Sequence, residues 1–200
     1  MNNPKNLNSF LIIFSLLMTL GMGQLFASTE TEIKDSMSKT IETITILIKD
    51  KSIEKSARHE KIEILVTPLF DFGLMARLSL GKTQWKKITP KERKNFSDLF
   101  ATRIKQSYMN KLDLYTDEQV IIDDAVRVKS RIHLPTHLVR KNEKRDILYK
   151  FYKSKKRGWL IYDVDILGVS IIQTYRSQFA GILKKDSFDV LIEKLKTEES

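Results

Sequence analysis

Two pairs of side chains have the types and spacing that could support chemistry at one site. His133 and His137 stand four residues apart, a spacing that brings two imidazoles to one metal ion on a helix. Pro135 separates them, and the surrounding alternation of apolar and polar residues is typical of a strand, so we do not expect a zinc site. Asp163 and Asp165 share one face of a strand, where paired carboxylates can carry out acid–base or metal chemistry. We interpret them instead as a solvated strand end or as partners for the chain's many lysines and arginines.

The common catalytic motifs are absent from the sequence. The chain has no cysteine, and it contains no G-x-S-x-G, no Gly-rich phosphate loop and no H-E-x-x-H segment. Gly168-Val169-Ser170 lacks the second glycine that a nucleophile elbow requires. We therefore expect no catalytic residue, no metal ligand and no cofactor.

The first 27 residues are typical of a cleavable signal peptide. Lys5 is the only charge before an apolar run of eleven residues, 10–20, which one serine and one threonine interrupt. That run suits the core of a signal peptide and is too short to cross a bilayer of roughly 30 Å as a helix. Cleavage after Ala27 is expected, with cleavage after Gly23 as the alternative, and an uncleaved anchor is the competing interpretation.

Residues 28–200 suit one domain that works outside the cytoplasm as a soluble protein. The absence of cysteine means that its core must hold the fold without disulfides. The net charge of the whole chain is +10, which favours solubility, an anionic membrane surface or an acidic partner protein. Nucleic acid is not an expected partner in that compartment.

Apolar residues recur at every third or fourth position in the N-terminal half of the chain. This period predicts helices over residues 33–48 and 53–66, the second ended by Pro68, and a short buried helix over residues 69–78. Thr89, Pro90 and Glu92 form a capping box with proline at the first helical position. A long helix should follow and end near Leu112.

After Asp117 the apolar period becomes two, which predicts antiparallel strands over residues 126–134, 147–151 and 159–164. Residues 135–144 are expected to form a short basic loop. Helices are expected over residues 169–183 and 188–195. Helices first and strands afterwards indicate a single α+β domain.

Three segments, in this order, resemble a known family. They are F-D-F-G-L-M-A-R over residues 70–77, F-S-D-L-F over residues 96–100, and W-L-I-Y-D-V-D-I-L-G-V-S over residues 159–170, followed by Y-R-S-Q-F. Together they are similar to the MlaC-type, or toluene-tolerance auxiliary, family of periplasmic phospholipid-binding proteins.

The resemblance implies helices on a curved antiparallel sheet, a nuclear-transport-factor-like cone, with an apolar pocket for phospholipid tails between the two. It implies periplasmic transport of lipid between an outer-membrane lipoprotein complex and an inner-membrane ABC transporter assembly, which maintains outer-membrane lipid asymmetry. Phospholipid would then be cargo, bound without a cofactor. The family varies in the loop over residues 135–144, so headgroup contacts are not carried over.

The expected pocket residues lie in or near these segments or on apolar faces of other elements. They are Phe70, Phe72, Met75, Leu78, Phe96, Phe100, Tyr108, Tyr149, Phe151, Trp159, Tyr162, Ile166 and Val169. The basic runs over residues 82–94 and 153–157 are candidates for headgroup or membrane contact, above all Lys155, Lys156 and Arg157.

The same apolar pattern also fits a fully packed core, so two other functions stay open. One is an interaction or assembly module that binds a partner protein through a basic face. The other is an esterase or phospholipase, which the missing nucleophile motifs disfavour.

The signal peptide can be tested on protein isolated from the cell envelope. Intact-mass measurement should show a chain that starts at Ser28, or at Gln24 if the alternative site is used. A full-length mass of 23.3 kDa would instead identify the apolar run as an anchor.

Overall fold

The computed structural model describes residues 21–112, 117–141 and 143–197. Within the first of these ranges, residues 21–28 are described by their backbone alone. The helices are α2 (Gly21–Lys49), α3 (Lys55–Val66), α4 (Phe72–Leu80), α5 (Lys82–Lys87), α6 (Pro90–Leu112), α7 (Ile171–Leu183) and α8 (Phe188–Thr197), with a 3₁₀ turn η1 (Thr67–Leu69). The strands are β1 (Gln119–Ile122), β2 (Val126–Val128), β3 (Arg131–Arg140), β4 (Glu143–Ser154), β5 (Gly158–Ile166) and β6 (Val169–Ser170). The predicted signal peptide lies mostly outside the described residues.

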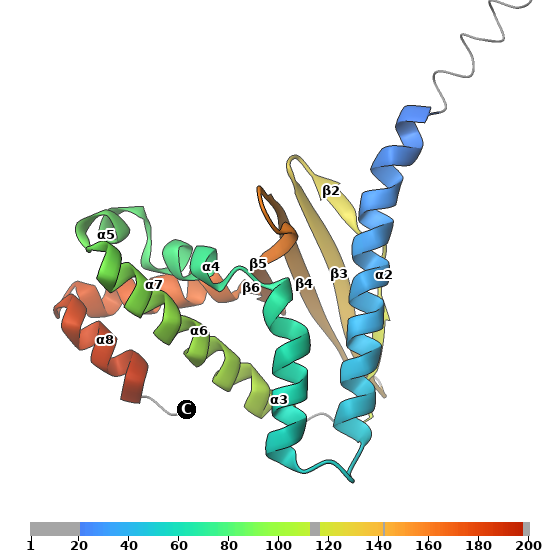
Figure 1. Ribbon diagram of the computed structural model, residues 1–200, viewed down its shortest axis with the longest axis horizontal. Coiled ribbons are helices and arrows are strands. Elements are labelled where there is room, and N and C mark those ends of the chain that lie inside the picture. The colour runs from blue at the N-terminus through green and yellow to red at the C-terminus, as the bar shows by residue number, and fades with distance from the viewer. Residues whose placement is uncertain (1–20, 113–116, 142, 198–200) are drawn as a thin grey trace, which may run out of the picture.

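The strands form one antiparallel sheet in the order β1-β3-β4-β5-β6, and β2 pairs with β3 beyond the end of β1. Helix α2 runs along the sheet, α4–α8 form a helical layer that extends away from it, and α3 stands between the two (Figure 1). The predicted α+β class is confirmed. The curved sheet is open and does not close into a cone.

The helical period located most helices correctly. The capping box forms as predicted, because the backbone N–H of Thr89 donates to Glu92 Oε2 (2.7 Å) and that of Glu92 donates to Thr89 Oγ1 (3.3 Å). Pro68 ends α3, but the chain continues through η1 before Asp71 caps α4 by accepting from the N–H of Leu74 (2.9 Å). Helix α5 lies in the basic run over residues 82–94, where no separate helix was predicted.

The prediction of one strand over residues 126–134 is wrong, because these residues form a hairpin of β2 and the start of β3. The chain reverses at Lys129, whose φ is 57°, so Val126 pairs with His133 and Arg127 with Ile132. This reversal places Arg127 on the face of the sheet that carries buried Ile132. Val126 is consequently 52% exposed.

Two further boundaries differ from the prediction. The segment 135–144 contains the end of β3 and the start of β4 rather than a loop. Pro135 is tolerated there because it falls between the parts of β3 that pair with β1 and with β2, where the ladder is interrupted. Val169 and Ser170 form β6, so the helix predicted from residue 169 begins at Ile171.

An aromatic cluster holds the helical layer together. The ring of Phe96, which is fully buried, lies 5.5 Å from Phe179 of α7 and 6.0 Å from Phe188 of α8. Phe100, also fully buried, lies 5.2 Å from Tyr175 in an edge-on arrangement. Edge-on and offset pairs of this kind add stability beyond the apolar area that they bury.

Asp163 joins the sheet to the helical layer. Its carboxylate, on β5, accepts hydrogen bonds from Ser170 Oγ (2.8 and 3.0 Å) and from the N–H of Ile172 in the first turn of α7 (3.3 Å). Lys150 Nζ lies 3.1 Å from Asp163 and 2.6 Å from Asp165. The two aspartates are therefore partners of a lysine, as the sequence indicated.

Replacing Asp163 with asparagine should lower the free energy of unfolding by about 2 kcal/mol, because a charged acceptor shared by a lysine, a hydroxyl and a helix N–H is lost. Urea unfolding of the delipidated protein measures this change. Asp165→Asn is the matched control and should cost less than about 1 kcal/mol, because Lys150 keeps Asp163. Equal costs for the two variants would contradict the assigned role of Asp163.

The same site should not respond to pH in the physiological range. Burial alone would lower the pKa of Lys150, but the hydrogen bonds and charges of Asp165 and Asp163 outweigh burial and raise it. A raised lysine pKa stabilises the fold below the pKa of the unfolded state, about 10.4, and that stability is lost only at higher pH.

Candidate functional site

The inner face of the sheet is the side that carries most of the buried apolar residues of the three central strands. Ile132 and Leu134 of β3 are fully buried there, Phe151 of β4 is 4% exposed, and Ile161 and Val164 of β5 are 0% and 5% exposed. These residues belong to one apolar core together with residues of α2, α4, α6, α7 and α8. The inner face is therefore covered by helices.

Tyr149 lies at the centre of this inner face and behaves differently from its neighbours. It pairs with Leu134 on one side and Val164 on the other, both of which are buried. Burial raises the pKa of the Tyr149 phenol to about 12. The side chain is nevertheless only half-buried. Tyr149 therefore keeps accessible surface between two buried neighbours.

Tyr108 of α6 shows the same combination. Burial, and secondarily the nearby Tyr175, raises its pKa to about 12, while the side chain is only half-buried. A second half-buried tyrosine thus lies on the helical side, packed against the same core.

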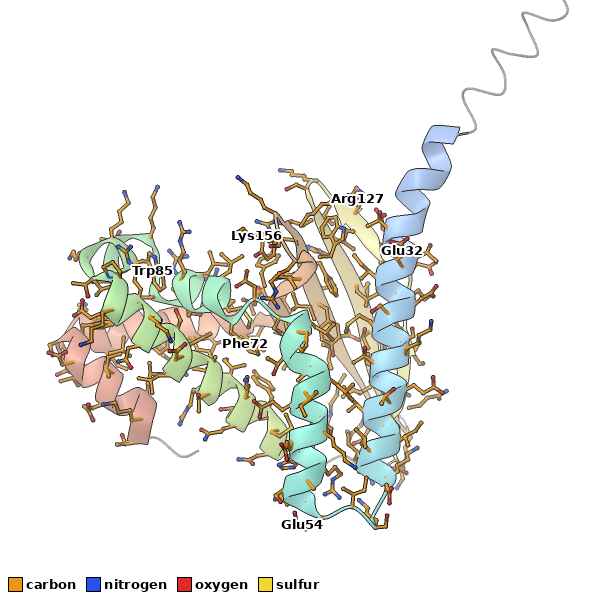
Figure 2. All side chains as sticks on the ribbon, viewed as in Figure 1. Glu32, Glu54, Phe72, Trp85, Arg127 and Lys156 are labelled. Carbon is orange, nitrogen blue, oxygen red and sulfur yellow. The ribbon has the colours of Figure 1, made fainter. Side chains whose placement is uncertain are left out.

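Most of the predicted pocket residues lie in or against the apolar core. Those that are buried in it are Met75, Phe96, Phe100 and Phe151. Those that are partly buried against it are Phe70, Phe72, Leu78, Tyr108, Tyr149, Trp159 and Ile166. Phe72 lies near the centre of the molecule, between the helical layer and the sheet (Figure 2).

Phe96 and Phe100 contact aromatic rings of the helical layer alone. The ring partners of Phe96 are Trp85, Phe100, Phe179 and Phe188, which lie on α5, α6, α7 and α8. Both rings are fully buried, so they form packed core and do not border an open space.

Two predicted pocket residues lie outside the core, and we correct their placement. Tyr162 is the extra residue of a bulge where the pairing of β4 with β5 shifts, and its ring faces Tyr152 (6.1 Å) and the guanidinium of Arg131 (4.6 Å). Val169 lies on β6 and is 61% exposed, next to Leu167, which is 62% exposed. The bulge and the short β6 change which side of the chain faces inward, and residue periodicity reveals neither.

The two histidines, His133 and His137, have different surroundings. His137 places its ring nitrogens 2.7 Å from Asp146 and 2.8 Å from Asp123. Burial, and secondarily Lys150, lowers the pKa of His133. Within the described part of the chain, no group of three or more histidine or carboxylate side chains has the arrangement of a metal site.

Arg127 is a positioning residue that the sequence analysis missed. Its Nε and Nη2 donate to the two carboxylate oxygens of Glu30 on α2 (2.6 and 2.9 Å), and its guanidinium lies 5.7 Å from the Trp159 ring. Lys34 of α2 adds an ion pair of 2.6 Å with Asp124. These contacts hold α2 along the sheet, and Figure 2 shows Arg127 beside this helix. The sequence analysis could have found Arg127 by recognising a turn at Lys129, because that turn places Arg127 on the same face of the sheet as Ile132.

The basic turn between β4 and β5 contains Lys155, Lys156 and Arg157, all of which are exposed. Lys156 lies at the tip of this turn (Figure 2). Arg157 differs from the two lysines because its Nη2 donates to the carbonyl of Pro68 in η1 (2.9 Å). The turn therefore presents two exposed lysines, and its arginine connects the sheet to the segment before α4.

No helix among residues 21–112, 117–141 and 143–197 has both the length and the apolar character needed to cross a bilayer.

Comparison with known proteins extends these observations. The solved structure of a phospholipid-binding protein from Ralstonia solanacearum, in complex with a phospholipid, superposes with a TM-score of 0.69 and 21% sequence identity, covering 82% of this chain and 94% of that one. The intermembrane phospholipid transport system binding protein MlaC of Haemophilus influenzae is 27% identical over 121 residues. That match covers 58% of this chain and 56% of the relative's own length. The family model described as MlaC protein matches residues 37–197, and the chain therefore belongs to the MlaC family.

Proposed function

We propose that the chain is a periplasmic phospholipid carrier whose acyl-chain site is the space beside Tyr149. The observation that carries the proposal is the half-buried ring of Tyr149 between the buried Leu134 and Val164 on a helix-covered sheet. Phe70, Phe72 and Trp159 are partly buried apolar residues against the same core. The phospholipid named for the Ralstonia structure and the transport system named for the Haemophilus relative support this assignment.

The energetics of acyl chains explain why a carrier needs such a space. At about 0.8 kcal/mol per methylene, two chains of about fifteen methylenes each would cost about 24 kcal/mol to expose to water. A carrier must therefore enclose nearly all of both chains. Apolar and aromatic walls suit this task because they accept chains of different length without fixed polar contacts.

The carrier would receive and deliver lipid between an outer-membrane lipoprotein complex and an inner-membrane ABC transporter assembly, and so maintain outer-membrane lipid asymmetry. Cleavage of residues 1–27 would release it into the periplasm. Transfer in either direction requires that lipid be held about as well by the carrier as by its partners. No covalent step belongs to this function, so we propose that the protein is not an enzyme.

Organic extraction of the native protein, followed by mass spectrometry, tests the proposed function directly. Intact phospholipid in the extract is the expected result. An extract without lipid would favour an interaction module with a solid core, and lysolipid or free fatty acid would favour a phospholipase.

Enlarging Tyr149 should distinguish an internal space from packed core. Tyr149→Trp adds volume where acyl chains would lie, so co-purified phospholipid should fall while the melting temperature of delipidated protein stays unchanged or rises. Leu134→Trp, on the neighbouring strand at a fully buried position, is the control and should be destabilising by about 1–3 kcal/mol. Similar destabilisation by both variants, with bound lipid unchanged, would show that Tyr149 is ordinary core.

The basic turn should act at anionic membranes through its lysines. Lys155→Glu combined with Lys156→Glu should weaken binding to anionic vesicles at low salt, because exposed charges are screened only beyond about 10 Å at 0.1 M salt. The urea midpoint of this variant should stay unchanged. Arg157→Ala should lower the free energy of unfolding by about 1 kcal/mol through the lost hydrogen bond to Pro68.

The control for the vesicle experiment is Lys39→Glu combined with Lys185→Glu, which changes the net charge equally at exposed positions on other elements. Equal weakening by the two charge reversals would show that only net charge matters. Binding that does not respond to salt would remove the membrane role of the turn.

A further inference from the structure

A second site lies on the helical layer. An open cleft of about 320 Å³ lies between the end of α4, the start of α5 and one side of α7. Its cationic lining residues are Lys82, Arg176 and Lys184, and its apolar ones include Leu80 and Leu183. The elements that form it lie in the layer that extends away from the sheet and from α2 (Figure 1).

The cations of the cleft are unneutralised. None of the residues that line it is an aspartate or glutamate. Within the described part of the chain, the side chains of Lys82, Arg176 and Lys184 make no ion pair or hydrogen bond. Three unpaired cations beside one hollow create a positive potential that attracts an anionic group.

The backbone positions Arg176 in this cleft. Gly81 has φ 82° and ψ 154°, a conformation that side chains other than glycine rarely adopt. A Cβ atom on Gly81 would lie 3.5 Å from both Nε and Nη2 of Arg176. The guanidinium therefore lies against the bare backbone of Gly81. The N–H of Gly81 donates to the carbonyl of Arg77 (3.1 Å), and the carbonyl of Gly81 accepts from the N–H of Trp85 (3.0 Å). Among the described residues the Arg176 side chain has no hydrogen-bond partner, so its donors are available to a ligand.

The combination of charge and apolar surface selects the class of ligand. A guanidinium presents a planar fork of donors that matches a carboxylate, and the adjacent leucines suit an apolar side chain next to that carboxylate. The cleft is at the lower end of the range of about 300–1,000 Å³ seen for small ligands, which suits a few side chains and not a pair of acyl chains. An acidic peptide segment with interspersed apolar residues meets both requirements.

We propose that this cleft docks an acidic segment of a partner protein, with carboxylates on Arg176 and Lys184 and an apolar side chain on Leu183. The site is separate from the space beside Tyr149, so the partner can be held while that space is occupied. The proposal goes beyond lipid carriage and holds equally for an interaction module.

Titration of the ¹⁵N-labelled protein with a short synthetic peptide of glutamate and leucine tests the proposal. Amide shifts should be confined to residues 80–84 and 176–184 and should saturate with a Kd below about 1 mM at low salt. The same peptide with glutamine in place of glutamate should cause no shift. Absence of saturable shifts at the cleft with the acidic peptide would overturn the proposal.

Matched variants locate the binding energy. Arg176→Glu and Lys184→Glu should each weaken the peptide at least about tenfold, because an attractive charge becomes repulsive. Lys185→Glu makes the same charge change outside the cleft lining and should leave the affinity unchanged. Melting temperatures check that each variant folds, and Lys184, at the exposed end of α7, provides the test if Arg176→Glu does not. Equal loss in all three variants would overturn the docking site.

The soluble headgroup glycerophosphoethanolamine is the competing probe. If it causes the same shifts at least as strongly as the peptide, the cleft is a headgroup site and the proposal is wrong. Lipid extracted from the same variants separates the two proposed functions. Unchanged bound phospholipid with lost peptide binding is the expected result, whereas lipid-free wild-type protein would contradict carriage and leave the peptide result intact.

Discussion

Asp163 fixes the point at which the chain leaves the sheet and enters the helical layer. Its carboxylate holds Lys150 across the strand pair and, through Ser170 and the N–H of Ile172, sets the start of α7. Helix α7 then carries Phe179 into the aromatic cluster, where it meets Phe96 of α6 and so orients the other helices. One buried acceptor with three kinds of donor thus links the sheet to the helical layer.

The two parts of the interior are packed differently. The aromatic cluster of the helical layer contains rings with no exposed surface, such as Phe96 and Phe100. The inner face of the sheet carries Tyr149, which is only half-buried. A solid helical layer can keep its shape without a ligand, and this rigidity would let the space that we propose beside Tyr149 persist when it is empty. Helix α2 is fastened along the sheet partly by the Arg127–Glu30 and Lys34–Asp124 ion pairs.

The described cationic side chains of the protein include two groups, those paired with carboxylates and those left unpaired on the surface. Some cations are structural, including Lys150 and Arg127, whose partners are carboxylates. Others carry no acidic partner within the described residues, namely those of the basic turn and of the cleft beside Gly81. A net charge of +10 therefore reflects specific unneutralised surfaces as well as general solubility. This separation is why a membrane contact at one place and a protein contact at another can be proposed for the same chain.

The sequence by itself determined most of the helices, the capping box at Thr89, the α+β class and the family, because local hydrogen bonding and the apolar period depend on neighbouring residues. It also offered, as one of two interpretations, that Asp163 and Asp165 are partners of lysine or arginine. Only the tertiary structure decided that Arg127 faces inward, since a two-residue turn reverses which side of a strand is buried. It alone separated Phe96, which is fully buried, from Tyr149, which keeps exposed surface. Periodicity shows which face of a helix or strand is apolar. How completely other side chains pack against that face depends on segments that are distant in the sequence.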